Sequence, residues 1–230
     1  MTATPRADGP ALPVLGGIRA AIVDLDGTMV DTIGDFEAAL AATLAELQLP
    51  RIDRAFIERT VGKGSEHLIR QVLAHVGAQA SWFDDAMAAY QRHYAACNGQ
   101  HSQVYPGVVA GLQRMRSAGW ALACLTNKPG RFARALLQIK GLDGHFAVVN
   151  GGDAFERKKP DPLPLLRTCD QLGLPPAAVL MVGDSANDVQ AARAAGCPVV
   201  LVGYGYNHGQ PAEAAGADAV VARLDQLLPG

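Results

Sequence analysis

The sequence has few cysteines and no long hydrophobic run. Its four cysteines lie far apart and form no C-x-x-C pair, which argues against a zinc site and a disulfide framework. The apolar run that starts at Ile18 is short and contains Asp24 and Asp26, which suits neither a signal peptide nor a membrane span. We therefore expect reduced thiols, no membrane partner and a cytoplasmic protein.

The sequence also lacks an excess of positive charge. Twenty Lys and Arg residues stand against 22 Asp and Glu residues, so the formal net charge is -2. Such a chain has no broad positive field for a nucleic-acid backbone, and we expect no nucleic-acid partner. With 49% hydrophobic residues and a mean hydropathy of +0.09, the 230-residue chain has the composition of a compact globular protein, expected as a monomer or homodimer.

Short apolar runs alternate with helix-like segments over most of the chain. The run from Ile18 to Asp24 ends in an acidic turn that contains glycine, as a buried parallel strand does. This alternation predicts an α/β fold, a Rossmann-like three-layer core whose parallel sheet is covered by helices on both faces. The other predicted strands are Trp120 to Thr126, Phe146 to Asn150, Ala178 to Gly183 and Pro198 to Val202.

One long connection interrupts this alternation. Residues 34–103 contain no convincing strand and are rich in Ala, Leu, Glu and Gln at helical spacing. We predict an inserted four-helix cap domain at 34–103, a core domain at 18–33 and 104–230, and a loose N-terminal tail at 1–17. The predicted cap helices are Asp35 to Leu47, Asp53 to Thr60, Ser65 to Val76 and Ser81 to Ala96.

Polar residues follow the predicted strands. In an open parallel sheet, ligands bind beyond the carboxyl ends of the strands, so these residues should converge on one crevice. The set suits metal-assisted phosphoryl transfer. Its members are Asp24-Leu-Asp26-Gly-Thr28, Thr126-Asn127-Lys128, Lys158-Lys159-Pro160 and Gly183-Asp184-Ser-Ala-Asn-Asp188.

Asp24 and Asp26 are the candidate catalytic residues. A carboxylate nucleophile at Asp24 would form an acyl phosphate that water can cleave. The second carboxylate, on Asp26, would protonate the leaving alkoxide and later take a proton from the attacking water. The alternative is that Asp-x-Asp-Gly is an ordinary acidic turn.

Asp184 and Asp188 are candidate ligands for Mg²⁺, together with Asp24 and Asp26. Magnesium takes oxygen ligands and keeps several waters, so few carboxylates are needed. Asp184, at a strand end, should bind directly. Asp188 lies at a helix start, where it binds through water or only stabilises the helix N-terminus.

Thr126, Asn127 and Lys159 are the candidate phosphate-binding residues. The hydroxyl and the amide can donate hydrogen bonds to phosphate oxygens, and a lysine can neutralise charge. The residue before a proline is held extended and neighbouring side chains then point opposite ways, which favours Lys159 over Lys158.

In this order and at these strand ends, the motifs resemble the haloacid-dehalogenase (HAD) superfamily. The resemblance implies a magnesium-dependent phosphatase that acts on a small phosphorylated metabolite and carries a mobile cap. Within the superfamily, several segments are similar to the bacterial phosphoglycolate phosphatases, which implies 2-phosphoglycolate as the substrate. They are Val61-Gly-Lys-Gly64, Tyr105-Pro-Gly107, Leu125-Thr-Asn-Lys-Pro129, Lys158-Lys-Pro-Asp-Pro162 and Val202 to Gly209.

Lys63 departs from that subfamily, in which asparagine is expected between the two glycines. Gly62, Gly64 and Ser65 precede a helix whose free N–H groups could hold an anion, and Lys63 adds a charge beside them. Lys63 is therefore a candidate for binding a substrate carboxylate, the alternative being a solvated loop lysine.

Other functions remain open at this point. A receiver domain also gathers acids, a Thr and a Lys around magnesium, but it is small and has no cap. A dehalogenase of the same superfamily would not need an acid at Asp26. A phosphosugar mutase, a pyrophosphatase and a nucleotidase share the core and differ in the cap.

Overall fold

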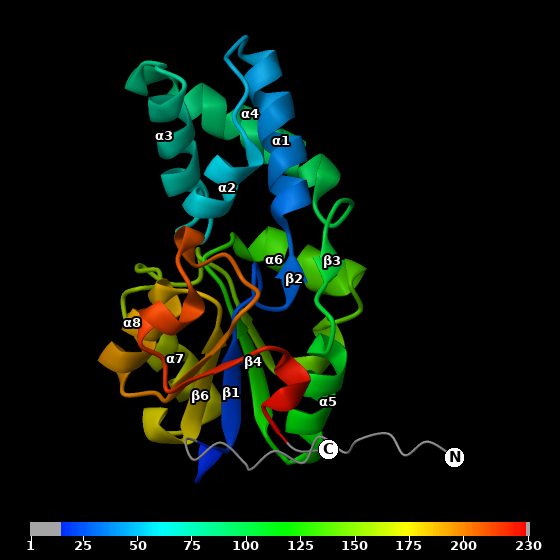
Figure 1. Ribbon diagram of the computed structural model, residues 1–230, viewed down its shortest axis with the longest axis vertical. Coiled ribbons are helices and arrows are strands. Elements are labelled where there is room, and N and C mark those ends of the chain that lie inside the picture. The colour runs from blue at the N-terminus through cyan, green and yellow to red at the C-terminus, as the bar shows by residue number, and fades with distance from the viewer. Residues whose placement is uncertain (1–14, 229–230) are drawn as a thin grey trace.

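Six parallel strands form the central sheet of the protein. A computed structural model describes residues 15–228, with the strands in the order β5-β4-β1-β6-β7-β8 (Figure 1). Strand order reverses around β1, because β4 pairs with one of its edges and β6 with the other. The strands are β1 (Ala20–Val23), β4 (Ala121–Leu125), β5 (Val148–Asn150), β6 (Val179–Gly183), β7 (Val199–Val202) and β8 (Ala219–Val221).

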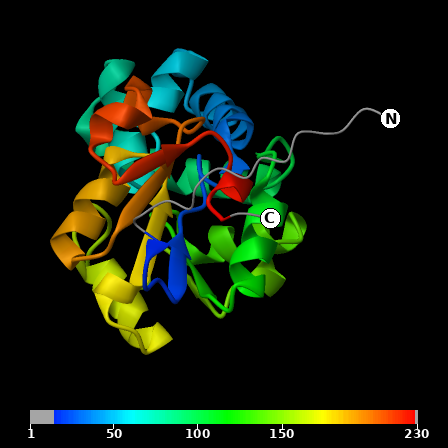
Figure 2. The same ribbon diagram turned by 60° about the horizontal axis from the view of Figure 1, so that its bottom comes forward.

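Helices cover both faces of this sheet. Alternate residues of a strand face opposite sides, so Ala21 and Val23 pack into one apolar cluster and Ala20 and Ile22 into another. Helices α5 (Val108–Ser117) and α6 (Gly130–Ile139) contribute to the first cluster, and α7 (Leu163–Leu172) and α8 (Ala186–Ala195) to the second. In Figure 2 the sheet lies between α5, in green, and α7 and α8, in yellow and orange.

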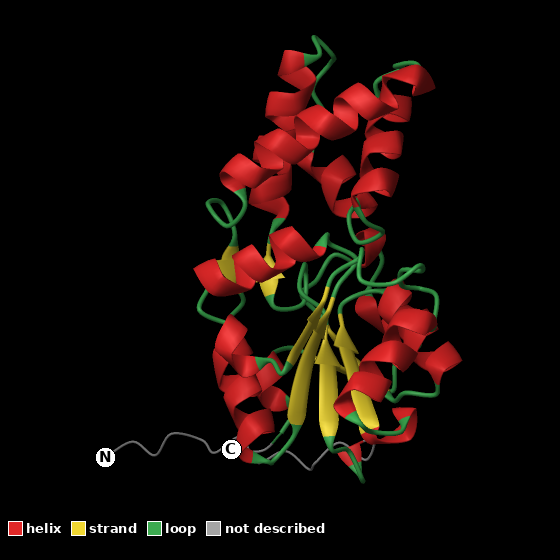
Figure 3. Ribbon diagram, turned by 180° about the vertical axis from the view of Figure 1, so that it is seen from behind, coloured by secondary structure: helices red, strands yellow, loops and turns green. Residues whose placement is uncertain are grey.

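The predicted α/β fold class is confirmed. The other four predicted strands are present as β4 to β7. The first strand is shorter than expected, at Ala20–Val23. Three strands were not predicted from the sequence. They are β8 and two very short strands, β2 (Val30–Asp31) and β3 (Gln103–Val104). Figure 3 shows the strands of the sheet pointing toward a group of helices beyond their carboxyl ends.

That group is built from the four helices expected between residues 34 and 103. They enclose an apolar cluster that includes Leu40, Ile69, Tyr90 and Tyr94. Asp53 accepts a hydrogen bond from the Phe56 N–H at 2.6 Å and so caps the second helix. The helices are α1 (Ile33–Glu46), α2 (Arg54–Thr60), α3 (Ser65–His75) and α4 (Phe83–Cys97).

The chain enters and leaves this helical group through two paired strands. β2 and β3 form an antiparallel ribbon in which Val30 pairs with Val104 and Asp31 with Gln103. Residues 1–14 of the predicted N-terminal tail lie outside the described residues. No helix within residues 15–228 is both long and apolar enough to cross a membrane.

Candidate active site

The turn after β1 places two aspartates beyond the end of the sheet. Asp24 follows the strand directly, and its carboxylate accepts a hydrogen bond from the Leu25 N–H at 2.8 Å. Gly27 has a φ of +81°, and a Cβ there would overlap the Asp184 carboxylate. A glycine is therefore needed where this turn passes the end of β6.

Three carboxylates meet at this edge of the sheet. Oxygen atoms of Asp24, Asp184 and Asp188 all lie within 4.8 Å of one another. The Nζ atom of Lys159 lies 3.1 Å from Asp24 Oδ1 and 2.7 Å from Asp188 Oδ1. The structure thus brings together four of the predicted site residues, contributed by segments that follow β1, β5 and β6.

Burial and mutual repulsion make the ionised acids unfavourable. Burial, opposed by Lys159 and reinforced by Asp188, raises the pKa of Asp24 to about 7. Burial and the charges of Asp188 and Asp24 raise the pKa of Asp184 well above its usual range. Burial alone would lower the pKa of Lys159, but the two neighbouring carboxylates outweigh burial and raise it.

A divalent cation fits this environment. The four predicted acids and the two buried lysines at the site, Lys128 and Lys159, carry a net charge of -2 when all six are ionised. Hard divalent cations take carboxylate oxygens as ligands and offset such charge. Asp24 and Asp184 are placed to hold the ion.

Asp184 is positioned by the turn after β1 and by the loop after β7. Its carboxylate accepts hydrogen bonds from the Tyr206 N–H at 2.7 Å and from Thr28 Oγ1 at 3.3 Å. A Cβ at Gly205 would overlap Asp184, which explains a glycine at that position. The Tyr206 hydroxyl donates to Asp31 Oδ1 at 2.9 Å and accepts from the Thr32 N–H at 2.7 Å, so one residue connects Asp184 to β2.

Asp188 stabilises the start of α8, which is one of the two roles that the sequence left open for it. Its Oδ2 atom accepts from the Ser185 N–H at 3.1 Å and the Ser185 hydroxyl at 3.0 Å, forming a capping box at the start of α8. Its Oδ1 atom accepts from Lys159. Because both oxygens have partners, this side chain holds Lys159 beside Asp24.

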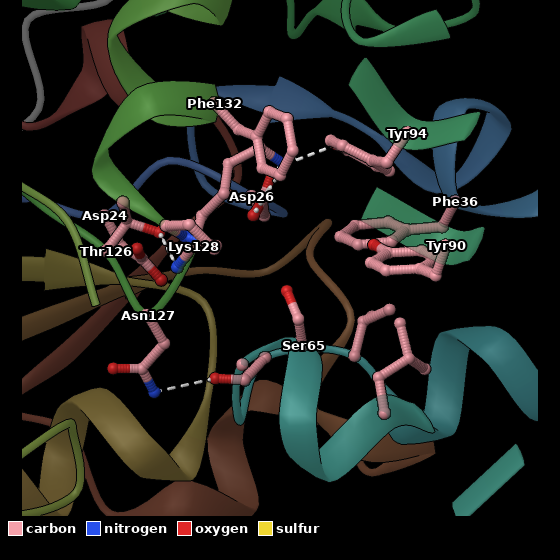
Figure 4. A pocket seen from close by; sticks show the side chains of 15 residues that line it. Asp24, Asp26, Phe36, Ser65, Tyr90, Tyr94, Thr126, Asn127, Lys128 and Phe132 are labelled. Carbon is pink, nitrogen blue, oxygen red and sulfur yellow. Dashed lines mark hydrogen bonds and ion pairs between the residues drawn. The ribbon is translucent and has the colours of Figure 1, made fainter. Parts of the chain in front are cut away.

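Thr126 and Asn127 follow β4 but lie differently. Thr126 Oγ1 accepts from the Lys128 N–H at 3.2 Å, which leaves the hydroxyl hydrogen for a ligand. The Asn127 side chain instead pairs with the backbone of Lys159, at 2.8 and 3.0 Å, and donates to the Gly62 carbonyl at 2.9 Å. Asn127 thus connects the sheet edge to the loop before α3 (Figure 4).

Asp26 lies outside the group of three acids. Its carboxylate is bonded to Lys128, whose Nζ atom lies 2.9 Å from Oδ1 and 3.3 Å from Oδ2. Lys128 also donates to the hydroxyl of Tyr94, on α4 (Figure 4). The sequence placed Lys128 in the polar segment after the second predicted strand but indicated no role for it in the site.

A small cavity of about 30 Å³ separates the sheet edge from the helical group. The sheet edge lines it with Asp24, Asp26, Thr126 and Lys128, and the helices line it mainly with aromatic rings. Gly62, Gly64 and Ser65 also line it. Lys63 is exposed and lies outside the lining, so the structure does not bring it together with the other predicted site residues.

Comparisons with known proteins agree with this geometry. The family model for haloacid dehalogenase-like hydrolases matches residues 18–196. The phosphoglycolate phosphatase of Cupriavidus necator is 45% identical to this chain, over 90% of this chain and 90% of its own length. That of Thiobacillus denitrificans is 42% identical, over 90% of this chain and 92% of its own length. A crystal structure described as a predicted phosphoglycolate phosphatase from Haemophilus somnus superposes with a TM-score of 0.88 at 28% identity, over 92% of this chain and 96% of that one. The chain belongs to the haloacid dehalogenase-like hydrolase family.

Proposed function

We propose that the protein is a magnesium-dependent phosphomonoester hydrolase that forms an aspartyl-phosphate on Asp24. The observation that carries this proposal is the group of three carboxylates around Lys159 at the reversal of strand order. Mg²⁺ would be held by Asp24 and Asp184 and would neutralise charge on the transferring phosphate. The carboxylate of Asp26 lies outside this group and is paired with Lys128, so we assign it to proton transfer and not to the metal.

The residues of the chain divide the reaction between them. Asp24 attacks phosphorus, while Lys159 and the Thr126 hydroxyl stabilise charge on the phosphate oxygens. Asp26 gives a proton to the oxygen of the leaving alcohol. It then takes a proton from water as that water attacks the aspartyl-phosphate, which releases phosphate and restores Asp24.

The proposed substrate is 2-phosphoglycolate, hydrolysed to glycolate and phosphate. The names of the similar proteins support this choice, and the small volume of the cavity favours a small ester over a large one. We further propose that residues 34–103 act as a cap on the core at 18–33 and 104–230. The contact from Asn127 to Gly62 supports a cap that is closed over the site in this structure. The cytoplasmic location and the oligomeric state stay predictions.

A panel of phosphorylated metabolites, assayed with Mg²⁺ and with excess chelator, tests the proposal. We expect 2-phosphoglycolate to give the highest kcat/KM, and chelation to abolish its turnover. Preference for a sugar phosphate or a nucleotide would contradict the proposed substrate. Undiminished activity after exhaustive chelation would contradict the metal-dependent mechanism. Formation of a long-lived acyl phosphate without turnover of any ester would favour a receiver-like role.

A further inference from the structure

Lys128 has a buried ammonium group and lines the cavity between the sheet edge and the helices. Its side chain is 2% exposed, and its recorded partners within residues 15–228 are Asp26 and the Tyr94 hydroxyl. An ammonium group has three N–H donors, and here they meet Asp26 Oδ1 at 2.9 Å, Asp26 Oδ2 at 3.3 Å and the Tyr94 hydroxyl. The contact with Asp26 Oδ2 is long, and an anionic ligand in the cavity would replace it with a shorter, charge-assisted hydrogen bond.

The surroundings of Lys128 favour an anion as that acceptor. The Nζ atom lies 4.8 Å from the ring centroid of Phe36 and 4.6 Å from that of Tyr94, so the helical side of the cavity is largely apolar here. Among residues 15–228, Lys128 is the one basic side chain that lines the cavity. Lys159 lies beneath Asp24 and is engaged by two carboxylates and by the Leu125 carbonyl. The region between Asp26 and the helices therefore has one cation for a ligand to bind.

The size of the cavity limits what that ligand group can be. A volume of about 30 Å³ holds roughly two water molecules, since one needs about 10–15 Å³. Asp24 and Thr126 line the same cavity, so a bound phosphate would share this space, and the part of the substrate beside Lys128 has to be small unless the helices move. Lys63 is exposed outside the cavity lining.

We propose that Lys128 determines specificity by binding a carboxylate on the leaving group of the substrate. Lys128 accordingly has two roles at one place: it positions Asp26 and it receives the negative charge of an α-carboxylate. This inference rests on the proposed phosphatase function and deepens it, because it assigns the carboxylate of the substrate to a residue of the core rather than to Lys63 in the cap loop.

The test compares a carboxylate ester with a neutral ester of nearly the same size. The kcat/KM values for 2-phosphoglycolate and 2-hydroxyethyl phosphate are measured with saturating Mg²⁺ in the parent protein and in Lys128→Met, Lys63→Met and Lys158→Met. Both reactions need Asp26, so the ratio of the two values cancels damage to the general acid. Lys158, half-buried in the neighbouring groove outside the cavity lining, is the matched control.

We expect Lys128→Met to lower the ratio by about 10- to 100-fold, the effect of losing a charge-assisted hydrogen bond in a site closed to water. Lys63→Met and Lys158→Met should leave the ratio unchanged. An equal loss for both esters in Lys128→Met, or a selective loss in Lys63→Met, would overturn the assignment. A parent enzyme that hydrolyses both esters equally well would also overturn it while leaving the phosphatase reaction intact. Absence of magnesium-dependent turnover of every ester would contradict the proposed function instead.

A second measurement covers the case in which Lys128→Met does not fold. Lys128→Gln retains N–H donors for Asp26 but carries no charge. Calorimetric binding in the Asp24→Asn background then compares 2-phosphoglycolate with inorganic phosphate, which lacks the carboxylate. We expect Lys128→Gln to weaken binding of 2-phosphoglycolate by at least about tenfold and that of inorganic phosphate much less. Equal weakening of both ligands would contradict the inference.

Discussion

The core wall of the cavity carries charge, whereas the cap wall carries aromatic rings and hydroxyl groups. The core supplies Asp24, Asp26, Thr126 and Lys128 from loops that follow β1 and β4. The cap side supplies no charged group to the lining among residues 15–228. Its members are Phe36, Val61, Gly62, Gly64, Ser65, Leu68, Tyr90 and Tyr94.

We expect the core wall to carry out the reaction and the cap wall to select the substrate. The acids and Lys159 are fixed by segments that follow the strands and by hydrogen bonds within the core, so changing them should affect every substrate. The cap wall sets the size and polarity of the space next to the phosphate. Lys128 lies where the two walls meet, because it bonds to Asp26 of the core and Tyr94 of the cap.

The sharpest test of the core wall is Asp24→Asn. An amide cannot act as this nucleophile, so we expect kcat to fall by about four orders of magnitude or more for all esters. The circular dichroism spectrum and the thermal unfolding transition should show a folded protein. Near-parent activity of this variant would show that the proposed nucleophile is wrong.

Removing Asp184 should abolish the response of the protein to metal. We expect Asp184→Ala to reduce turnover at least about a hundredfold at moderate Mg²⁺, since a direct carboxylate ligand is lost. Thermal shift assays should show that Mg²⁺ stabilises the parent and has little effect on the variant. An unchanged magnesium dependence would remove Asp184 from the metal site.

The raised pKa of Asp24 gives this metal response a pH dependence. The pKa is about 7 in the folded chain without metal and 3.8 in the reference state, so the folded state binds more protons between these values. Without metal, the contribution of Asp24 to the stability of the folded state is complete below pH 4 and is lost as the pH rises through 7. The increase in Tm caused by Mg²⁺ should therefore be larger at pH 8 than at pH 5. An equal or smaller shift at pH 8 would contradict the charge balance described for the acids.

Asp26→Asn should separate substrates by their leaving group. Loss of a general acid costs about 10²- to 10⁴-fold for 2-phosphoglycolate, whose alkoxide must be protonated. p-Nitrophenyl phosphate has a stable leaving group, so its first step should be affected much less. A burst of p-nitrophenol followed by slow turnover would identify this step, and equal losses for both substrates would contradict the role of Asp26.

The smallest effect is expected from Tyr206→Phe, which acts between the two walls. The change removes the hydroxyl contacts with Asp31 and Thr32 and keeps the backbone bond to Asp184. We expect the free energy of unfolding to fall by about 1 to 2 kcal/mol, measured by urea denaturation. The ratio of kcat/KM for different esters should stay constant. A large change in that ratio would show that Tyr206 influences which substrate is hydrolysed.

Local patterns were sufficient to predict the fold class. The apolar runs that became β1, β4, β6 and β7 are buried on both faces, and such strands are continuous and hydrophobic in sequence. β8 has three residues, and β2 and β3 have two each, so no period can be recognised in them. Their pairing depends on contacts between residues far apart in the chain.

The candidate site was predictable where one residue at a strand end decides the geometry. Asp24 and Asp184 are such residues, whereas Lys159 was predicted from the proline that follows it. The role of Lys128 was not predicted, because its partners Asp26 and Tyr94 lie 102 and 34 residues away and nothing near it in sequence indicates burial. The amide of Asn127 suggested a ligand contact, but the fold uses it to connect Lys159 with Gly62.

The ribbon of β2 and β3 has a consequence for how this architecture can be modified. Asp31 and Gln103 are paired neighbours, so the insertion begins and ends at adjacent points of the core. Antiparallel neighbours can be joined by a hairpin of two residues. We therefore expect that a short turn can replace the intervening segment without changing the path of the six-stranded sheet. A chain with a short turn in place of residues 32–102 is a direct way to obtain the core as a separate module.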